Sequence, residues 1–223
     1  MKNRSFVIGD IHGCYFTLRA MLFEELDISI NDQVYFLGDY IDRGPYSKEV
    51  LDLIIRLIDN GYNINCLRGN HEQMALEAPL SKSDNENWLT MGGDATLKSF
   101  KIKKIEEIDK KYLHFFKSLD YYFELDNFIL VHANLNFFAE NPFNDLYSML
   151  WSRNDDVYPD KIGGRKIIGG HTPTALNKIN ESIISNKIKL DGGCVYKGKK
   201  NYGNLCALNL NTLELHVNKN IDF

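Results

Sequence analysis

SFVIGDIHGCYFTLRAMLFEEL, residues 5–26, contains the order of segments that predicts the fold of this chain. Its first four residues, SFVI, form a short apolar run of the kind found in buried strands. A polar turn with two glycines follows, and from residue 14 the apolar residues recur at helical spacing. The stretch therefore predicts a strand, a turn that carries polar side chains, and a helix.

The same order continues through the first third of the chain. Apolar runs at 33–37 and 63–67 predict two more strands. Residues 47–61 between them have helical spacing and end on a glycine, which is common at a helix C-terminus. This β-α-β-α-β order is typical of parallel strands joined by helical crossovers.

Beyond residue 72 the pattern predicts helices first and strands afterwards. Residues 73–120 are more polar and contain a clear helical pattern at 106–119. Short β-like runs follow, and the last two have the pattern of a hairpin around Asn211 and Thr212. These runs lie at 121–125, 128–132, 166–170, 188–191, 205–210 and 213–217. We therefore predict an α/β protein with one mixed sheet, or with two sheets packed face to face.

Length and composition are those of a water-soluble globular protein. The chain has 223 residues, 44% hydrophobic and 25% charged, which suits one domain with a real core. The net charge of -4 argues against general attraction to nucleic acid or anionic lipid, and no apolar stretch is long enough to span a membrane. The four cysteines show no paired metal-binding spacing. Without a secretory signal, we expect reduced thiols and a cytoplasmic location; the oligomeric state stays open.

Polar side chains follow six of the predicted strands, usually beside glycine. They are Asp10 and His12, then Asp39, Asp42 and Arg43, then Arg68, Asn70 and His71, and finally His132, His171 and Asp191. In open α/β sheets ligands bind outside the carboxyl ends of the strands, and glycine lets the backbone approach a ligand closely. We therefore expect these clusters to converge on one site.

The donor types in these clusters favour a catalytic site with two divalent metal ions. Carboxylate oxygens and imidazole nitrogens without thiolate suit Mn, Fe or Zn. Asp10 and His12 are two residues apart, so both can point to one side of an extended segment. A carboxylate shared between two ions, for which Asp39 is the candidate, would hold them about 3.5–4 Å apart, as in two-metal hydrolases.

The arginines beside these clusters indicate that the attacked group is a phosphate ester. Arg43 and Arg68 each adjoin a turn that carries predicted ligands, and Arg153 is a third candidate, because guanidinium matches phosphate with two hydrogen bonds. His71 is not needed as a ligand, so it is the candidate acid for the leaving oxygen, with Asp42 orienting it. No nucleophile motif of a covalent phosphatase occurs, which favours direct attack by metal-bound hydroxide.

Several motifs resemble those of the PPP-type serine/threonine phosphatases, within the calcineurin-like metallophosphoesterases. They are GDIHG at 9–13, GDYIDRG at 38–44 and RGNHE at 68–72, followed in order by His132, GGHT at 169–172 and DGG at 191–193. The chain looks like the compact bacterial or phage type. The resemblance implies two mixed β-sheets packed as a sandwich flanked by α-helices. It also implies a single domain over 1–223, in which a helical insertion at about 73–120 shapes the substrate pocket.

The resemblance also implies a role for each motif residue. The first metal would be bound by Asp10, His12 and Asp39, and the second by Asp39, Asn70, His132 and His171. His71 with Asp42 would be the acid pair, and Arg43, Arg68 and Arg153 would bind phosphate. Two manganese ions are the first expectation, with iron or zinc as alternatives. One departure is Asn134, which stands where relatives often have glycine, and we expect it to alter the local loop.

Three functions remain open, and the first is favoured. It is hydrolysis of phosphomonoesters, with a phosphorylated protein or a small phosphoester as substrate and partner and with no nucleic acid expected. The alternative is hydrolysis of symmetrical dinucleoside polyphosphates such as diadenosine tetraphosphate. Similar hydrolases of that class usually have aspartate in place of Glu72 and lack the counterpart of Asp42. The third is a non-catalytic, phosphate-recognising scaffold, which should have lost a ligand or His71, and none is missing.

Overall fold

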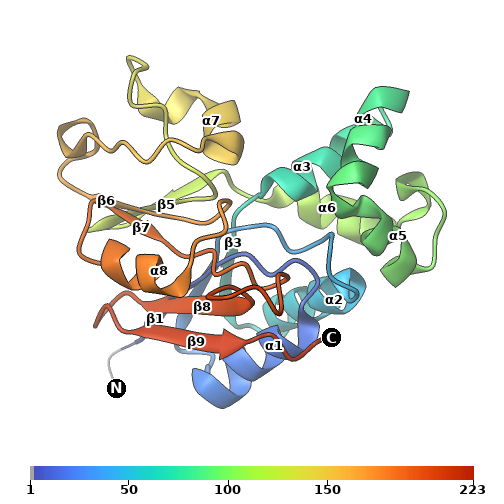
Figure 1. Cartoon of the computed structure of the whole chain (residues 1–223), viewed down its shortest axis with the longest axis horizontal. Helices are drawn as coiled ribbons and strands as arrows, with labels where there is room; N and C mark the ends of the chain where they lie inside the picture. The colour runs from blue at the N-terminus through green and yellow to red at the C-terminus, as the bar shows by residue number, and fades with distance from the viewer. Residues whose placement is uncertain (1–2) are drawn as a thin grey trace.

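The first sheet joins the three N-terminal strands to the C-terminal hairpin. In this computed structural model, which describes residues 3–223, its strand order is β3-β2-β1-β8-β9 (Figure 1). Strands β1, β2 and β3 are parallel, whereas β8 is antiparallel to β1 and to β9. The strands are β1 (Ser5–Ile8), β2 (Gln33–Phe36), β3 (Asn63–Cys66), β8 (Asn204–Asn209) and β9 (Leu215–Lys219). The predicted parallel unit and terminal hairpin are therefore confirmed.

The second sheet is built from the strands that follow the helical middle of the chain. Its order is β4-β5-β6-β7, with β5, β6 and β7 parallel and β4 antiparallel to β5. The strands are β4 (Tyr122–Glu124), β5 (Phe128–Val131), β6 (Lys166–Gly169) and β7 (Lys187–Lys189). Two mixed sheets are thus present, as the family resemblance implied, rather than one.

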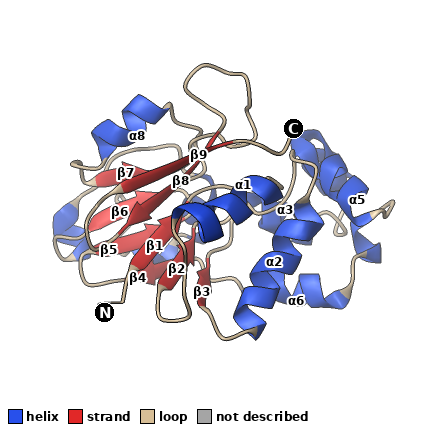
Figure 2. Cartoon of the chain, turned by 90° about the horizontal axis from the view of Figure 1, so that it is seen from below, coloured by secondary structure: helices blue, strands red, loops and turns tan. Residues whose placement is uncertain are grey.

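Side-chain alternation along the strands explains why the two sheets stack (Figure 2). Val7 of β1 packs in the same buried cluster as Leu130 of β5 and Ile168 of β6, so this face of the first sheet meets the second sheet. Phe6 and Ile8, on the opposite face, pack in the core that includes the helices. A third core covers the outer face of the second sheet. The result is a sandwich of two sheets with helices outside.

Helices cover the sandwich and form a lobe beside it. In Figure 1, α3 to α6 lie to one side of the sheets, and α7 lies near β5 and β6. The α-helices are α1 (Tyr15–Ala20), α2 (Ser47–Asp59), α3 (Asn70–Glu77), α4 (Lys82–Trp88), α5 (Asp94–Phe100), α6 (Lys110–Ser118), α7 (Leu146–Trp151) and α8 (Leu176–Ser182). Shorter or π-type turns are η1 (Met21–Glu25), η2 (Leu89–Gly93), η3 (Ile105–Glu107), η4 (Pro142–Asn144) and η5 (Pro159–Ile162). Within residues 3–223, no helix has the length and apolar character needed to cross a bilayer.

Candidate active site

The predicted polar clusters meet where strands of both sheets end, and the backbone there is unusual. Gly69 and Gly170 let the chain approach carboxylates closely: a Cβ would lie 2.1 Å from Asp39 Oδ1 in the first case and 2.0 Å from Asp10 Oδ1 in the second. Left-handed backbone angles in residues other than glycine cost free energy and gather at functional sites. Here they occur at His12, Asp39, Asp42, Arg43 and His171, with φ of 47°, 52°, 72°, 68° and 65°.

One group of metal-binding donors surrounds Asn70 at the start of α3. Its Oδ1 lies 2.9 Å from His132 Nε2 and 2.9 Å from His171 Nδ1. Asp39 Oδ1 lies 3.5 Å from the same His132 nitrogen. The four residues that the sequence assigned to one metal are therefore together.

The tautomer of His132 shows that this group fits a cation. Its Nδ1 donates a hydrogen bond to the Leu37 carbonyl, 2.8 Å away, as metal-bound histidines commonly do. Burial is the largest influence on the pKa of the ring and lowers it, which favours the neutral form with a lone pair on Nε2. That lone pair faces Asn70 Oδ1, which is also an acceptor. In that form two buried acceptors lie 2.9 Å apart, an arrangement that fits a cation between or beside them.

A second group of donors lies on the other side of Asp39. His12 Nδ1 donates to the Ile41 carbonyl at 2.9 Å, and His12 Nε2 lies 3.5 Å from Asp39 Oδ2. The third donor close to these two is His71, whose Nε2 is 4.0 Å from Asp39 Oδ2. Asp39 therefore lies between the two groups, in the position expected of a shared ligand.

Asp10 is placed differently from the other predicted ligands. It is absent from the tight groups of donor atoms in residues 3–223, and its Oδ2 instead accepts the backbone N–H of His171 at 2.9 Å. Its Oδ1 is buried without a hydrogen-bond partner among those residues, like His71 Nε2 and His171 Nε2. An orphaned buried carboxylate oxygen such as Asp10 Oδ1 is costly, and a bound cation would satisfy it. Two divalent ions therefore fit the donor set.

The charges of the site also favour bound cations. Burial, followed by the charges of Asp191 and Asp39, raises the pKa of Asp10 well above its usual value. Burial disfavours ionisation of Asp39 too, but the neighbouring imidazoles outweigh it and hold its pKa below the usual range. Burial, with smaller contributions from His132 and Arg153, lowers the pKa of His171 to about 3. Burial and like charge thus oppose ionisation of Asp10 and protonation of His171, and a bound cation would offset the repulsion between the carboxylates.

His71 and Asp42 form a buried pair beside the metal-binding donors. Asp42 Oδ2 lies 2.7 Å from His71 Nδ1 and also accepts the Trp88 indole N–H at 2.9 Å, while its Oδ1 accepts the Thr96 hydroxyl at 2.6 Å. Burial lowers the pKa of His71, but Asp39 and Asp42 act against it, and the net pKa is raised. The arrangement leaves His71 Nε2 free to hold a proton toward the site.

Trp88 and Thr96 were not identified as functional residues from the sequence. They come from α4 and α5, in the helical segment 73–120, and both are fully buried against Asp42. Their distance along the chain from Asp42 follows no spacing rule, so only the tertiary fold reveals the contact. The segment thus supports the acid pair directly.

Glu72 is another residue whose role the sequence did not predict. Both of its oxygens are buried and accept backbone N–H groups: Oε1 from Tyr40 at 2.9 Å and Ile41 at 3.3 Å, and Oε2 from Asp39 and Gly69, both at 3.0 Å. These bonds join the loop after β2 to the start of α3. Glu72 therefore holds the strained backbone that carries Asp39.

Replacing Glu72 with glutamine is expected to destabilise the protein by about 2–4 kcal/mol, because an NH₂ group would face buried N–H donors. Urea unfolding of the metal-free protein measures this. Glu77→Gln on the same helix, where the carboxylate accepts only the Gln73 side chain, is the matched control and should change stability by under about 0.5 kcal/mol. Equal stability of the two variants would contradict this role of Glu72.

Arg43 lies directly at the metal-binding donors, whereas Arg153 lies at the edge of the site. Arg43 is half-buried, and its Nη1 is 2.5 Å from His12 Nε2. Arg153 is exposed and comes two residues after Trp151, whose ring packs edge-on against His171 at 6.2 Å between centroids. Arg43 thus contacts a donor histidine directly, whereas the charge of Arg153 reaches His171 and helps to lower its pKa.

Arg68 points its guanidinium toward other partners. It donates to Gln73 Oε1 at 3.0 Å, to the Tyr121 hydroxyl at 2.8 Å and to the Lys117 carbonyl at 3.1 Å. The group also lies 4.8 Å from the centroid of the Tyr121 ring. A phosphate contact from Arg68 would therefore require some of these bonds to be exchanged.

Asp191 lies beside Asp10 rather than behind a ligand histidine. Its Oδ1 accepts the Gly193 N–H at 2.8 Å, and no hydrogen bond joins it to an imidazole within residues 3–223. Burial raises its pKa to about 7. This carboxylate is therefore placed beside another acidic side chain and gives no hydrogen-bond support to a histidine ring in the described part of the chain.

Comparison with known proteins identifies the family of this chain. The model of the calcineurin-like phosphoesterase family matches residues 4–201. A serine/threonine-protein phosphatase 2 from Salmonella typhimurium is 28% identical over 217 residues, covering 88% of this chain and 90% of that protein. An asymmetrical bis(5'-nucleosyl)-tetraphosphatase from Geobacillus sp. is 27% identical over 219 residues, covering 86% of each chain.

Solved structures show the same fold. A serine/threonine phosphatase from Saccharomyces cerevisiae superposes with a TM-score of 0.64 at 17% identity, covering 97% of this chain and 79% of that one. A cold-active protein-tyrosine phosphatase from a Shewanella species gives 0.66 at 16% identity, covering 96% and 80%. Because the family match spans most of the sequence and the donors fit two metals, this chain belongs to the calcineurin-like phosphoesterase family.

Proposed function

We propose that this phosphoesterase is a serine/threonine protein phosphatase that hydrolyses phosphomonoesters. The observation that supports it most is the buried His71–Asp42 pair, 2.7 Å apart, next to two groups of metal-binding donors. A serine or threonine alkoxide is a poor leaving group, so its departure benefits from a positioned acid. The aspartate of this pair is the residue that distinguishes the sequence from the dinucleoside polyphosphate hydrolases it resembles.

Each site residue has a proposed part in this reaction. Bound divalent ions, with manganese expected first, would activate a water molecule and neutralise charge on the phosphoryl oxygens. The residues proposed to hold them are Asp10, His12, Asp39, Asn70, His132 and His171. Arg43 and Arg153 bind phosphoryl oxygens, and Arg68 does so if its present bonds are exchanged. His71 protonates the leaving oxygen from Nε2 while Asp42 holds Nδ1.

Hydrolysis of dinucleoside polyphosphates is the second candidate. The Geobacillus relative named for that activity aligns over 86% of both chains. Its substrates contain phosphoanhydrides, whose leaving groups are better and need the acid less. A purely binding role is disfavoured, because the donor set and the acid pair are both complete.

The free cysteines of the described residues suit a reducing, cytoplasmic compartment.

A panel of three substrates tests the proposed function. Metal-stripped protein with manganese added back is given a phosphoserine peptide, p-nitrophenyl phosphate and diadenosine tetraphosphate. We expect kcat/KM for the two monoesters to exceed that for the dinucleotide by more than about tenfold. The reverse preference would move the function to nucleotide turnover, and no metal-dependent release from any substrate would favour the scaffold.

A further inference from the structure

The chain on either side of Arg153 is held at fixed points. On the N-terminal side, Trp151 packs edge-on against His171, 6.2 Å between ring centroids. Arg153 itself is exposed, and its side chain makes no hydrogen bond or ion pair with residues 3–223. An arginine free of partners is available for a phosphoryl group, but its backbone must be ordered for the contact to be productive.

Asn134 holds the chain on the C-terminal side of Arg153. It is fully buried, two residues after His132. Its Nδ2 donates to the Asn154 carbonyl at 2.7 Å and to the Asp156 carbonyl at 3.1 Å. Its backbone is not left-handed. The side chain, rather than an unusual backbone angle, is therefore what Asn134 contributes to the loop. A glycine here, as the family resemblance led us to expect, would have no side-chain amide to offer.

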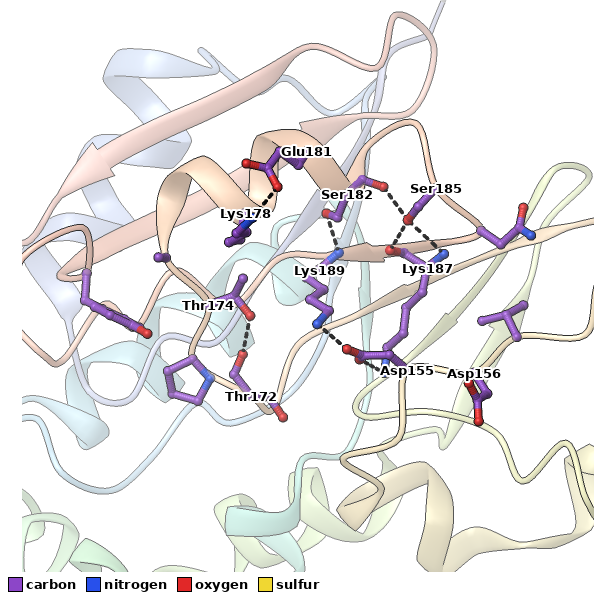
Figure 3. A pocket seen from close by; sticks show the side chains of 15 residues that line it. Asp155, Asp156, Thr172, Thr174, Lys178, Glu181, Ser182, Ser185, Lys187 and Lys189 are labelled. Atoms are coloured by element: carbon purple, nitrogen blue, oxygen red, sulfur yellow. Dashed lines mark hydrogen bonds and ion pairs between the residues drawn. The ribbon is translucent and has the colours of Figure 1, made fainter.

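Two lysines of β7 also hold this loop. Lys187 and Lys189 alternate with Ile188, so both point to one side of the strand, and both pair with Asp155 (Figure 3). Lys187 Nζ lies 3.3 Å from Asp155 Oδ1 and also donates to the Asn154 carbonyl at 3.0 Å. With 9% of its side chain exposed, Lys187 is a buried charge whose partners are all in this loop.

The loop forms one wall of a cavity of about 740 Å³, with α8 opposite (Figure 3). On the α8 wall, Lys178 pairs with Glu181 on its own helix, at 2.6 Å, and with no other acidic side chain among residues 3–223. The lysines of β7 therefore differ from this neighbour: they tie the loop to the second sheet, whereas Lys178 does not.

We infer that Asn134, Lys187 and Asp155 form a clamp that positions Arg153 for the phosphoryl group. Asn154 directly follows Arg153. Its carbonyl accepts hydrogen bonds from both the Asn134 amide and the Lys187 ammonium. Arg153 thus stands between this anchored carbonyl and Trp151. The clamp residues do not touch substrate; they act through Arg153, and this inference rests on the role proposed for that arginine.

The test measures inorganic phosphate binding by calorimetry on manganese-loaded protein, together with kcat/KM on p-nitrophenyl phosphate. Arg153→Ala should weaken phosphate binding about 10–100-fold, because charge-assisted bonds are lost. Lys187→Met and Asn134→Ala should each weaken it about tenfold through misplacement of the arginine. Lys178→Met is the control and should change binding by less than about twofold.

A double-mutant cycle separates positioning from general damage to the fold. In the Arg153→Ala background, Lys187→Met should have no further effect on phosphate binding, because the residue it positions is gone. An equal effect in both backgrounds would overturn the clamp, and so would unchanged binding in Lys187→Met. Asp155→Asn, at a side chain that is 56% exposed, is the second variant; it should weaken phosphate binding in the wild-type background and have no further effect in the Arg153→Ala background.

The binding measurement also separates this inference from the proposed function. Calorimetry needs no turnover, so a protein that binds phosphate through a clamped Arg153 but hydrolyses no tested ester would retain the clamp and lose the phosphatase assignment. Hydrolysis that is unaffected by Arg153→Ala would retain the phosphatase assignment and overturn the clamp.

Discussion

His71→Asn is expected to lower turnover of a phosphoserine peptide by about 10²–10⁴-fold, the usual contribution of a positioned general acid. Asparagine is polar and smaller, so it fits the buried position and retains hydrogen-bonding capacity toward Asp42. It has no group that can release a proton near neutral pH. Proton donation to the leaving oxygen is therefore lost, while the surrounding site is kept.

The leaving group provides a sharper readout of this role. p-Nitrophenolate leaves without protonation, so p-nitrophenyl phosphate should lose much less activity than the peptide. Metal content, measured by elemental analysis, should be that of the wild type. His114→Asn, at an exposed histidine of α6, is the matched control and should be fully active. Wild-type turnover of the peptide by His71→Asn would show that another group supplies the proton.

Asp39→Asn is expected to have the second large effect, a loss of metal binding together with at least about a 10³-fold fall in turnover. Asp39 is the carboxylate that lies between the two donor groups, with one oxygen 3.5 Å from His12 Nε2 and the other 3.5 Å from His132 Nε2. The amide has no negative charge and only one acceptor oxygen, so it cannot serve both groups.

Metal analysis and rescue distinguish this cause from misfolding. The variant should hold less manganese than the wild type at equal free metal, and higher manganese should restore part of the activity. Asp52→Asn on α2, where the carboxylate pairs with Lys48 and Lys111 away from the site, is the control and should keep metal and activity. Full metal content with full activity in Asp39→Asn would refute the assignment of a shared ligand.

Local patterns explain why most elements could be predicted. The strands at 5–8, 33–36 and 63–66 and the helix at 47–59 lie where apolar periodicity placed them. The site clusters followed from a general rule, because each was expected at the carboxyl end of a strand and strand ends of this kind share an edge. Neither inference needed contacts between distant residues.

Long-range side-chain contacts explain what the sequence did not predict. Asn134 shows this best: its effect on backbone shape was expected, yet it acts through an amide that reaches Asn154 and Asp156. Arg68 adjoins the site in sequence, but its guanidinium is bound to residues of and after α6. Adjacency along the chain does not fix where a long side chain points.

By itself, the sequence determined the order of strands and helices, the family, and the residues that meet at the strand ends, because these depend on spacing and motif. The family resemblance also implied two sheets, and the tertiary structure decided which of their faces meet. Val7 faces Leu130 across them, while its neighbours Phe6 and Ile8 face helices. It also decided that Trp88 and Thr96 hold Asp42 and that Glu72 holds the loop of Asp39. Those contacts arise from packing between segments far apart in the chain, for which no local pattern exists.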